Sequence, residues 1–263
     1  MTVFFLLLLL SSSPLRLVSL APSLTEIVYY LNIDSLLVGN TIYCNYPEDA
    51  KKKTHVGDLI NPNIERIKKL KPDYILLVSP MQDRLAYKLN KAGLNVLKCR
   101  QDNFIDIANC MKKIGKLVQD TSGYVRFMKE IKNIDTLSAF RKKPKVVFVL
   151  SQRPMYAPGK NTFIDEIIHK AGGENAFSFN GYKMVSVEKI HLANPDIIIL
   201  VGEKSNPQRF SKKLGIRETD ASQKHCIFKV DTDVFTRPGP RVINAVLELR
   251  KIMENCIKDG KNQ

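Results

Sequence analysis

Apolar runs of strand length alternate with polar, helix-like stretches along much of the chain, and one such unit is well defined at residues 63–78. It starts with the polar Asn63, continues through a charged segment and ends in a Pro-Asp pair followed by an apolar run. Asparagine is a favoured N-cap residue, and an unbroken apolar run is typical of a strand buried on both faces of a parallel sheet. The pattern predicts a short helix, a turn and a buried strand.

The same unit returns without a gap at residues 186–201. The matched pairs are Glu65 with Glu188, Ile67 with Ile190, Pro72 with Pro195 and Asp73 with Asp196. A weaker echo lies upstream of each copy, where strands at 15–20 and 145–150 each precede an amphipathic helix, at 25–31 and 163–171. In the first helix, Ser23 and Glu26 have capping-box spacing, which places Pro22 on the loop just outside it. This alternation predicts an α/β protein of two small lobes, each with a mostly parallel sheet and helical cover.

Between the two copies, apolar residues recur at helical spacing over residues 118–140, with no proline inside. They are Tyr124, Phe127, Met128, Ile131, Ile134 and Leu137. One long helix over 118–142 is therefore expected to join an N-terminal lobe at 14–117 to a C-terminal lobe at 143–263. A single helical connector resists bending, so we expect a stiff clamp that permits only a small rotation between the lobes.

The chain opens with an apolar run over residues 1–10, followed by three serines and Pro14. This is the shape of a short secretory signal, although it lacks a basic start, so residues 1–13 are interpreted as a signal remnant. The run is too short to span a bilayer. No cysteine follows it where a lipid anchor would attach, so we expect an exported protein, periplasmic or otherwise extracytoplasmic, in soluble form.

Composition narrows the class of protein. The 263 residues are 44% hydrophobic and 25% charged, which is ordinary globular material. The formal net charge is +15, but Lys and Arg are spread along the chain rather than gathered in one segment, which argues against a nucleic-acid partner. The excess of positive charge predicts a general attraction for anionic ligands or anionic lipid.

The five cysteines have no C-x-x-C spacing, so no zinc site or dithiol motif is indicated. An odd count leaves at least one thiol free in an oxidising compartment, and small buried apolar roles are expected for most of them. The cysteines are Cys44, Cys99, Cys110, Cys226 and Cys256.

Several motifs together resemble the cobalamin and ferric-siderophore binding proteins of ABC importers. In the first half these are residues 16–27, 46–50, 55–58 and 61–67, and in the second half residues 156–167, 171–177, 185–188 and 237–241. The resemblance implies two lobes joined by a helical hinge, and a monomer that holds its ligand in the cleft and delivers it to a membrane permease driven by an ATPase. A corrinoid is the expected ligand, and a ferric siderophore, haem or another metal chelate is the alternative.

The resemblance also indicates site residues. Pro22, Tyr43, Tyr156 and Tyr182 stand on loops expected at the carboxyl ends of strands, where α/β lobes bind ligands, and tyrosines there offer flat apolar area and a hydroxyl. Leu59 stands where the cobalamin binder has a tryptophan, a residue type absent from this chain. Asp233 and Arg237 resemble polar pocket residues, with a surface ion pair as the alternative.

The repeat places Glu65 and Glu188 at equivalent tips of the two lobes, where family members use such a pair to dock on permease arginines. The alternative is that each glutamate only stabilises the first turn of its helix through the macrodipole, by about 0.3 to 1 kcal/mol. Two carboxylates displayed symmetrically would orient a two-fold basic partner.

No enzyme is expected. The sequence has no nucleotide-binding glycine motif and no G-x-S-x-G, and its four histidines lack metal-ligand spacing, so neither a metal nor a cofactor is predicted. A chelatase-like two-lobed enzyme would need a Cys or His cluster in the cleft. A scaffold protein would explain the repeat but not the tyrosines.

Overall fold

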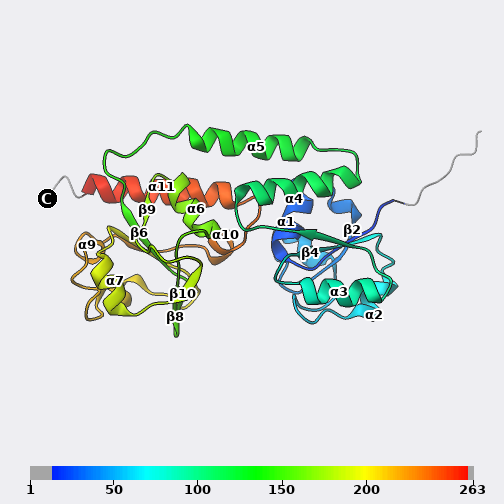
Figure 1. Ribbon diagram of the computed structural model, residues 1–263, viewed down its shortest axis with the longest axis horizontal. Coiled ribbons are helices and arrows are strands. Elements are labelled where there is room, and N and C mark those ends of the chain that lie inside the picture. Colours follow the sequence, from blue (N-terminus) through cyan, green and yellow to red (C-terminus); the bar gives the residue numbers. More distant parts are fainter. Residues whose placement is uncertain (1–13, 260–263) are drawn as a thin grey trace, which may run out of the picture.

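The computed structural model describes residues 14–259, which form two α/β lobes side by side (Figure 1). The predicted signal, residues 1–13, lies outside the described residues. The N-lobe is built on one parallel sheet in the order β3-β2-β1-β4-β5. Its strands are β1 (Leu17–Ser19), β2 (Leu37–Asn40), β3 (Thr54–His55), β4 (Tyr74–Val78) and β5 (Val96–Cys99), and its helices are α1 (Pro22–Tyr30), α2 (Ile64–Lys69), α3 (Asp83–Lys91) and α4 (Phe104–Leu117).

The C-lobe contains a parallel sheet in the order β12-β11-β6-β9 and a smaller antiparallel sheet in the order β10-β8-β7. Its strands are β6 (Lys145–Val149), β7 (Ser151–Gln152), β8 (Met155–Pro158), β9 (Glu174–Asn175), β10 (Tyr182–Met184), β11 (Ile197–Leu200) and β12 (Ile227–Lys229). Its helices are α6 (Phe163–Lys170), α7 (Val187–Ala193), α8 (Pro207–Ser211), α9 (Asp220–Gln223), α10 (Thr232–Thr236) and α11 (Val242–Asp259). Two mostly parallel lobes confirm the predicted fold class, whereas the antiparallel sheet was not predicted.

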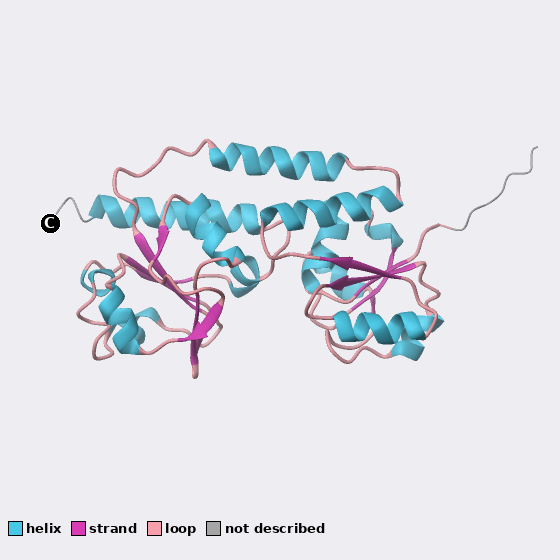
Figure 2. Cartoon of the chain, viewed as in Figure 1, coloured by secondary structure: helices cyan, strands magenta, loops and turns pink. Residues whose placement is uncertain are grey.

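A continuous helical layer runs along one side of both lobes, formed by α4, α11 and α5 (Ser122–Asp135) (Figures 1 and 2). Alternate strand residues face it: Leu76 of β4 and Ile199 of β11 belong to one apolar cluster with residues of these helices. Their neighbours Ile75 and Ile198 face the opposite side and pack in separate clusters, one in each lobe. One apolar cluster therefore connects both lobes through the helical layer.

The predicted repeat is present as two helix-strand units. Asn63 caps α2 by accepting a hydrogen bond from the Arg66 N–H at 2.8 Å, and Ser186 caps α7 by accepting one from the Lys189 N–H at 3.3 Å. The strands that follow, β4 and β11, each lie between two parallel neighbours. Both caps and both buried strands are therefore confirmed.

The capping box predicted at Ser23 and Glu26 is wrong. Helix α1 begins two residues earlier than this box requires, with Ala21 at the N-cap and Pro22 as its first residue. Proline suits this position because its fixed φ is helical and its missing N–H would have no partner there. Ser23 instead bonds to Gln101, and Glu26 pairs with two arginines.

The connecting helix is shorter than the predicted 118–142. The chain leaves α4 at Leu117, turns at Gln119 with φ of 57°, and starts α5 only at Ser122, whose N–H donates to the Asp120 carboxylate. After Asp135 the chain runs as a loop to β6. Phe140 fits the apolar spacing although the helix has ended. Its ring packs on the Arg250 guanidinium, which lies 3.7 Å from the ring centre.

Four cysteines form disulfides, Cys99 with Cys110 and Cys226 with Cys256. Cys44 is free and buried, so the expected free thiol is present. The expectation that most cysteines act as simple buried residues is wrong, because the fold brings distant cysteines together in a way that spacing does not reveal. Each disulfide ties the strand region of one lobe to α4 or α11 of the helical layer.

Candidate functional site

A cavity of about 670 Å³ lies between the lobes. The N-lobe wall comes from segments that follow β1, β3, β4 and β5, and the C-lobe wall from the start of α6, from β10 and from the end of α10 with the chain after it. The carboxyl ends of parallel strands are where α/β lobes place ligands, because the connecting loops meet there. Of the residues singled out in the sequence, the cavity wall includes Pro22, Leu59, Tyr182 and Arg237. We call this cavity the cleft.

Buried hydrogen bonds hold the N-lobe wall in place. The Gln82 side chain is 3% exposed; its Nε2 donates to the carbonyl oxygens of Leu20 and Leu59 at 3.0 and 2.7 Å, and its Oε1 accepts from the Val78 N–H. This anchors the segment that carries Leu59 in the cleft. Met81, which is 62% exposed, adds a flexible apolar side chain to the same wall.

Two predicted tyrosines of the C-lobe lie in strands of the antiparallel sheet, which corrects the prediction that they stand on loops after parallel strands. Tyr182 lies in β10 opposite Pro158, and Met184 lies opposite Tyr156 of β8. Residues two apart on a strand and those directly opposite share a face, so Tyr156, Tyr182 and Met184 form one partly exposed apolar face. Only Tyr182 of these three borders the cleft.

The hydroxyl of Tyr182 stays protonated over a wide pH range. Desolvation is the main cause that raises its pKa to about 12, while a contact with Thr162 lowers it. Its side chain is nevertheless 49% exposed, since the ring stands in the open concave cleft with protein around it. Tyr182 can therefore offer a neutral hydroxyl and an apolar ring to a ligand.

A buried ion cluster joins the lobes beside the cleft. Glu26 of α1, whose side chain is 2% exposed, accepts two hydrogen bonds from Arg241, at 2.9 Å to Oε2 and 2.6 Å to Oε1. Arg237 Nη1 lies 3.3 Å from Glu26 Oε1. The two arginines precede α11 in the C-lobe, so this carboxylate links the lobes. We call these three residues the Glu26 cluster.

Tyr43 and Asp233 support Arg237 instead of bordering the cleft. Asp233 lies 2.9 Å from Arg237 Nη2 and accepts from Asn45, and the Tyr43 carbonyl oxygen accepts from Arg237 at 3.4 Å. The Tyr43 side chain is half exposed. The sequence left open whether Asp233 and Arg237 are pocket residues or an ion pair. The two side chains form an ion pair, and Arg237 also borders the cleft.

Charges in the cleft wall are balanced. Arg100 and Arg237 are matched by Asp102 and Asp106. Arg100 Nε lies 3.0 Å from Asp102 Oδ2, and Arg237 already has the carboxylate partners described above. The remaining polar wall residues are hydroxyl or carboxamide side chains, Ser23, Ser79, Gln101, Asn103, Asn161, Thr162 and Thr236. Despite the chain's net charge of +15, this site does not present an excess of positive charge.

Among residues 14–259, no histidine contributes to the cleft wall. His55 bonds through Nδ1 to Asn40 Oδ1 at 2.9 Å, and His191 to the Gly215 carbonyl oxygen. Within residues 14–259 there is no cluster of His, Cys, Asp and Glu that could hold a metal ion.

Glu65 and Glu188 occupy the first turns of α2 and α7. In Figure 1 these helices lie at the ends of the lobes away from the helical layer. Glu65 makes an exposed pair with Lys68 at 3.0 Å. A hydrogen bond from Ser186 is the main cause that lowers the pKa of Glu188. Both carboxylates are exposed, and the lowered pKa of Glu188 keeps that group charged at neutral pH.

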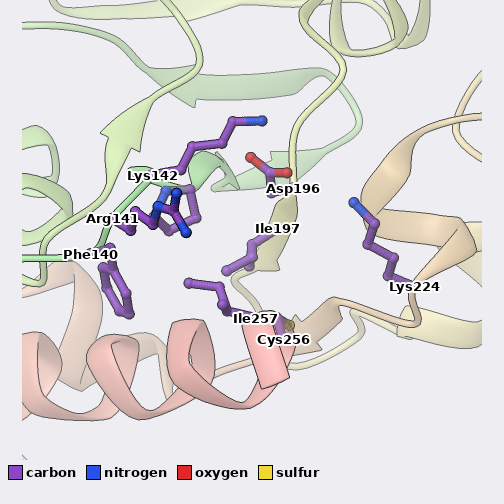
Figure 3. Close-up of a pocket in the computed structure, with 9 residues that line it drawn as sticks. Phe140, Arg141, Lys142, Asp196, Ile197, Lys224, Cys256 and Ile257 are labelled. Atoms are coloured by element: carbon purple, nitrogen blue, oxygen red, sulfur yellow. The ribbon is translucent and has the colours of Figure 1, made fainter. Parts of the chain in front are cut away.

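A second cavity of about 490 Å³ lies on the C-lobe near the start of β11 (Figure 3). Arg141, Lys142 and Lys224 line it together with Asp196, Ile197 and Cys256. It is at the amino end of the parallel strands and belongs to one lobe. The cleft, which both lobes line, is therefore the candidate binding site.

Sequence reasoning did not identify Gln101 or Met81. Both follow a strand of the N-lobe sheet directly, after β5 and β4 respectively, so the same rule that selected Pro22 would have found them.

Two α/β lobes around a shared cleft define a ligand-binding protein rather than a scaffold. The sequence profile described as periplasmic binding protein matches residues 17–234, and the chain belongs to this family. The uncharacterized ABC transporter substrate-binding lipoprotein YvrC of Bacillus subtilis is 32% identical, over 91% of this chain and 80% of its own length.

Two solved structures extend the comparison. A possible iron-binding (periplasmic solute-binding) protein from Staphylococcus epidermidis is 31% identical, with a TM-score of 0.79 over 90% of this chain and 98% of its own. The periplasmic vitamin B12 binding protein BtuF of Vibrio cholerae is 24% identical, with a TM-score of 0.79 over 92% and 98%. The second likeness shows the fold alone.

Family membership makes this chain a substrate-binding protein of an ABC transporter and not an enzyme. The family works outside the cytoplasm. Among the described residues, none of the helices has the length and apolar character needed to cross a bilayer.

Proposed function

We propose that this protein captures a corrinoid in the cleft and delivers it to a membrane permease. The observation that carries the proposal is the cleft wall, which combines balanced charges, many hydroxyl and carboxamide groups, and the apolar side chains of Leu59, Met81 and Tyr182. A corrinoid is large, carries amide side chains around its ring and has little net charge, so it matches such a wall. A strongly anionic chelate would favour unpaired cations.

A ferric siderophore or other iron chelate is the second candidate. It is favoured by the 31% identity to the Staphylococcus protein titled as possibly iron-binding. Tyr182 also offers such a chelate an apolar ring and a neutral hydroxyl. Haem is a third member of the same ligand class, and the absence of histidine from the cleft wall removes its commonest axial ligand.

Within this proposal, Pro22, Leu59, Tyr182 and Arg237 contact the ligand. Tyr156 extends the apolar face of the C-lobe next to Tyr182. Tyr43 and Asp233 act by holding Arg237 in position.

Calorimetric titration of the purified protein with cyanocobalamin, cobinamide, haemin and ferric siderophores tests the ligand. Saturable binding of the corrinoids, weakened in Tyr182→Ala, is the expected result. Binding of iron chelates alone would replace the corrinoid by the second candidate. A protein that binds none of the four would contradict the proposed ligand class.

For delivery, we propose that Glu65 and Glu188 dock on basic residues of the permease. Their support is their equivalent placement in the two copies of the repeat and their exposure. Two separated carboxylates match a two-fold basic surface and would set orientation and association rate. Replacing both by Ala should abolish uptake by the reconstituted importer and leave ligand binding intact. Glu48→Ala, another exposed glutamate, is the matched control; equal uptake by all variants would exclude docking through this pair.

We also propose that the chain is exported by residues 1–13 and works as a monomer, with lobes at 14–117 and 143–263. Two disulfides support an oxidising compartment, because cytoplasmic thiols are kept reduced. Cell fractionation with and without residues 1–13, and size-exclusion chromatography with light scattering, test these two points.

A further inference from the structure

One side chain of the cleft wall has a hydrogen-bonding group without a partner. Gln101, just after β5, is 4% exposed, and its Nε2 has no acceptor among the described residues. The only other buried side-chain atom in this condition within residues 14–259 is the Tyr29 hydroxyl, which does not border the cleft. Buried donors are nearly always bonded, because desolvation without an acceptor costs free energy.

The direction of this carboxamide is fixed by Ser23. The Ser23 hydroxyl donates to Gln101 Oε1 at 2.8 Å, and both side chains are buried. In this bond the hydroxyl is the donor and the carboxamide oxygen is the acceptor, so the oxygen end of the carboxamide faces Ser23. The NH₂ end is then the free end. A donor held in this way loses little conformational entropy when an acceptor arrives.

The surroundings of Gln101 favour an oxygen acceptor. Ser23 and Pro22 belong to the first turn of α1, and no side chain caps that turn. The other two helices that begin at the cleft are capped, α4 by Asn103 and α6 by Thr162. An uncapped helix N-terminus carries partial positive charge, which attracts a carbonyl or carboxylate oxygen and repels a donor.

We propose that Gln101 is a specificity-determining residue whose NH₂ group donates a hydrogen bond to a carboxamide or carboxylate oxygen on the rim of the bound ligand, beside the first turn of α1. This inference rests on the proposed function, since it requires the ligand to occupy the cleft. It adds the chemistry of one contact: the ligand group at this point accepts a hydrogen bond. Ser23 is the positioning residue.

Two nearly isosteric substitutions separate the possible roles. Gln101→Leu removes the donor and leaves an apolar side chain. Gln101→Glu keeps the oxygen that bonds Ser23 and replaces the donor by an acceptor. Titration with cyanocobalamin, cobinamide and haemin should show a dissociation constant raised about tenfold in Gln101→Leu for the probe that the wild type binds, and raised further in Gln101→Glu, since two acceptors then face each other.

Gln82→Leu is the matched control for stability. The Gln82 side chain makes three hydrogen bonds, whereas the Gln101 side chain makes one. The melting temperature should therefore fall more in Gln82→Leu than in Gln101→Leu, while Gln101→Leu loses affinity. A purely structural role for Gln101 predicts the reverse, a loss of stability with affinity within twofold of the wild type.

Binding by the wild type that is unchanged in both Gln101 variants overturns the inference and leaves the proposed function standing. Binding retained in Gln101→Glu but lost in Gln101→Leu overturns the assignment of an acceptor, because the ligand group would then be a donor. A wild type that binds none of the probes removes the proposed ligand class, and this inference with it.

Discussion

The two lobes share a frame and differ at the cleft. Each has a capped helix followed by a buried central strand, α2 with β4 and α7 with β11, and each has a disulfide to the helical layer. At the cleft, the N-lobe offers loops that carry hydrogen-bonding groups, whereas the C-lobe offers an antiparallel sheet with an apolar, aromatic face. The shared parts set the spacing of the two lobe tips, and the divergent parts set what binds between them.

The joint between the lobes should give the largest effect. In Glu26→Gln, two arginines that are mostly buried lose their shared carboxylate, and removing one partner of a buried ion pair costs about 3 to 5 kcal/mol. Urea unfolding should show a loss of about 3 kcal/mol. Glu48→Gln breaks an exposed pair and should change the free energy of unfolding by about 0.5 kcal/mol or less. Equal losses would mean that the Glu26 cluster does not hold the lobes together.

The two disulfides should differ in what they protect. Loop-closure entropy predicts a loss of about 4 kcal/mol on replacing Cys226 and Cys256 by Ser, and about 3 kcal/mol for Cys99 and Cys110, since their separations are 30 and 11 residues. The cleft residues 100–103 lie between Cys99 and Cys110. Only the replacement of Cys99 and Cys110 should therefore also weaken ligand binding. Guanidinium unfolding and calorimetry on both variants check this contrast. Equal affinity in both would remove the link between this disulfide and the cleft.

The aromatic face of the C-lobe should show a gradient in binding. Tyr182 borders the cleft and Tyr156 lies on the same face further out. We expect Tyr182→Ala to weaken ligand binding about tenfold and Tyr156→Ala about threefold, because less ring area meets the ligand. Tyr87→Ala, on the outer helix α3, should bind as the wild type does. A larger loss of affinity in Tyr156→Ala than in Tyr182→Ala would mean that the ligand lies closer to Met184 than proposed.

The smallest effect is a pH dependence at Glu166, which links α6 to α4 by accepting the Phe104 N–H at 2.8 Å. Desolvation is the main cause that raises the pKa of Glu166. A raised pKa means that the folded state holds the proton more tightly, so the stabilising contribution is present below the unfolded pKa and is lost as pH rises through the folded pKa. Glu166→Gln, which keeps an acceptor oxygen, should gain stability relative to the wild type as pH rises from about 4 to 7. Thermal melts across this range would show a constant difference if Glu166 titrated normally.

The helix-strand units of the two lobes could be predicted from the sequence because they depend on local residue patterns. The N-caps Asn63 and Ser186, the Pro-Asp turns and the apolar strands depend on neighbours a few residues away, and the repeat showed that they occur twice. The capping box failed at Ser23 for the opposite reason: its partner, Gln101, lies 78 residues away. The long connector failed because apolar spacing cannot distinguish a residue buried by its helix from one, such as Phe140, that packs on a distant arginine.

By itself, then, the sequence determined the two α/β lobes, the matched glutamates on α2 and α7, and the class of protein to which the motifs belong. Only the tertiary structure decided which cysteines pair and that Glu26 joins the lobes. It also decided that Tyr182 borders the cleft while Tyr43 does not, and that the Gln101 NH₂ group has no acceptor among the described residues. Helices and strands follow from periodicity along the chain, whereas each of these contacts joins residues far apart in sequence, and their distances exist only once the lobes have packed on a common helical layer.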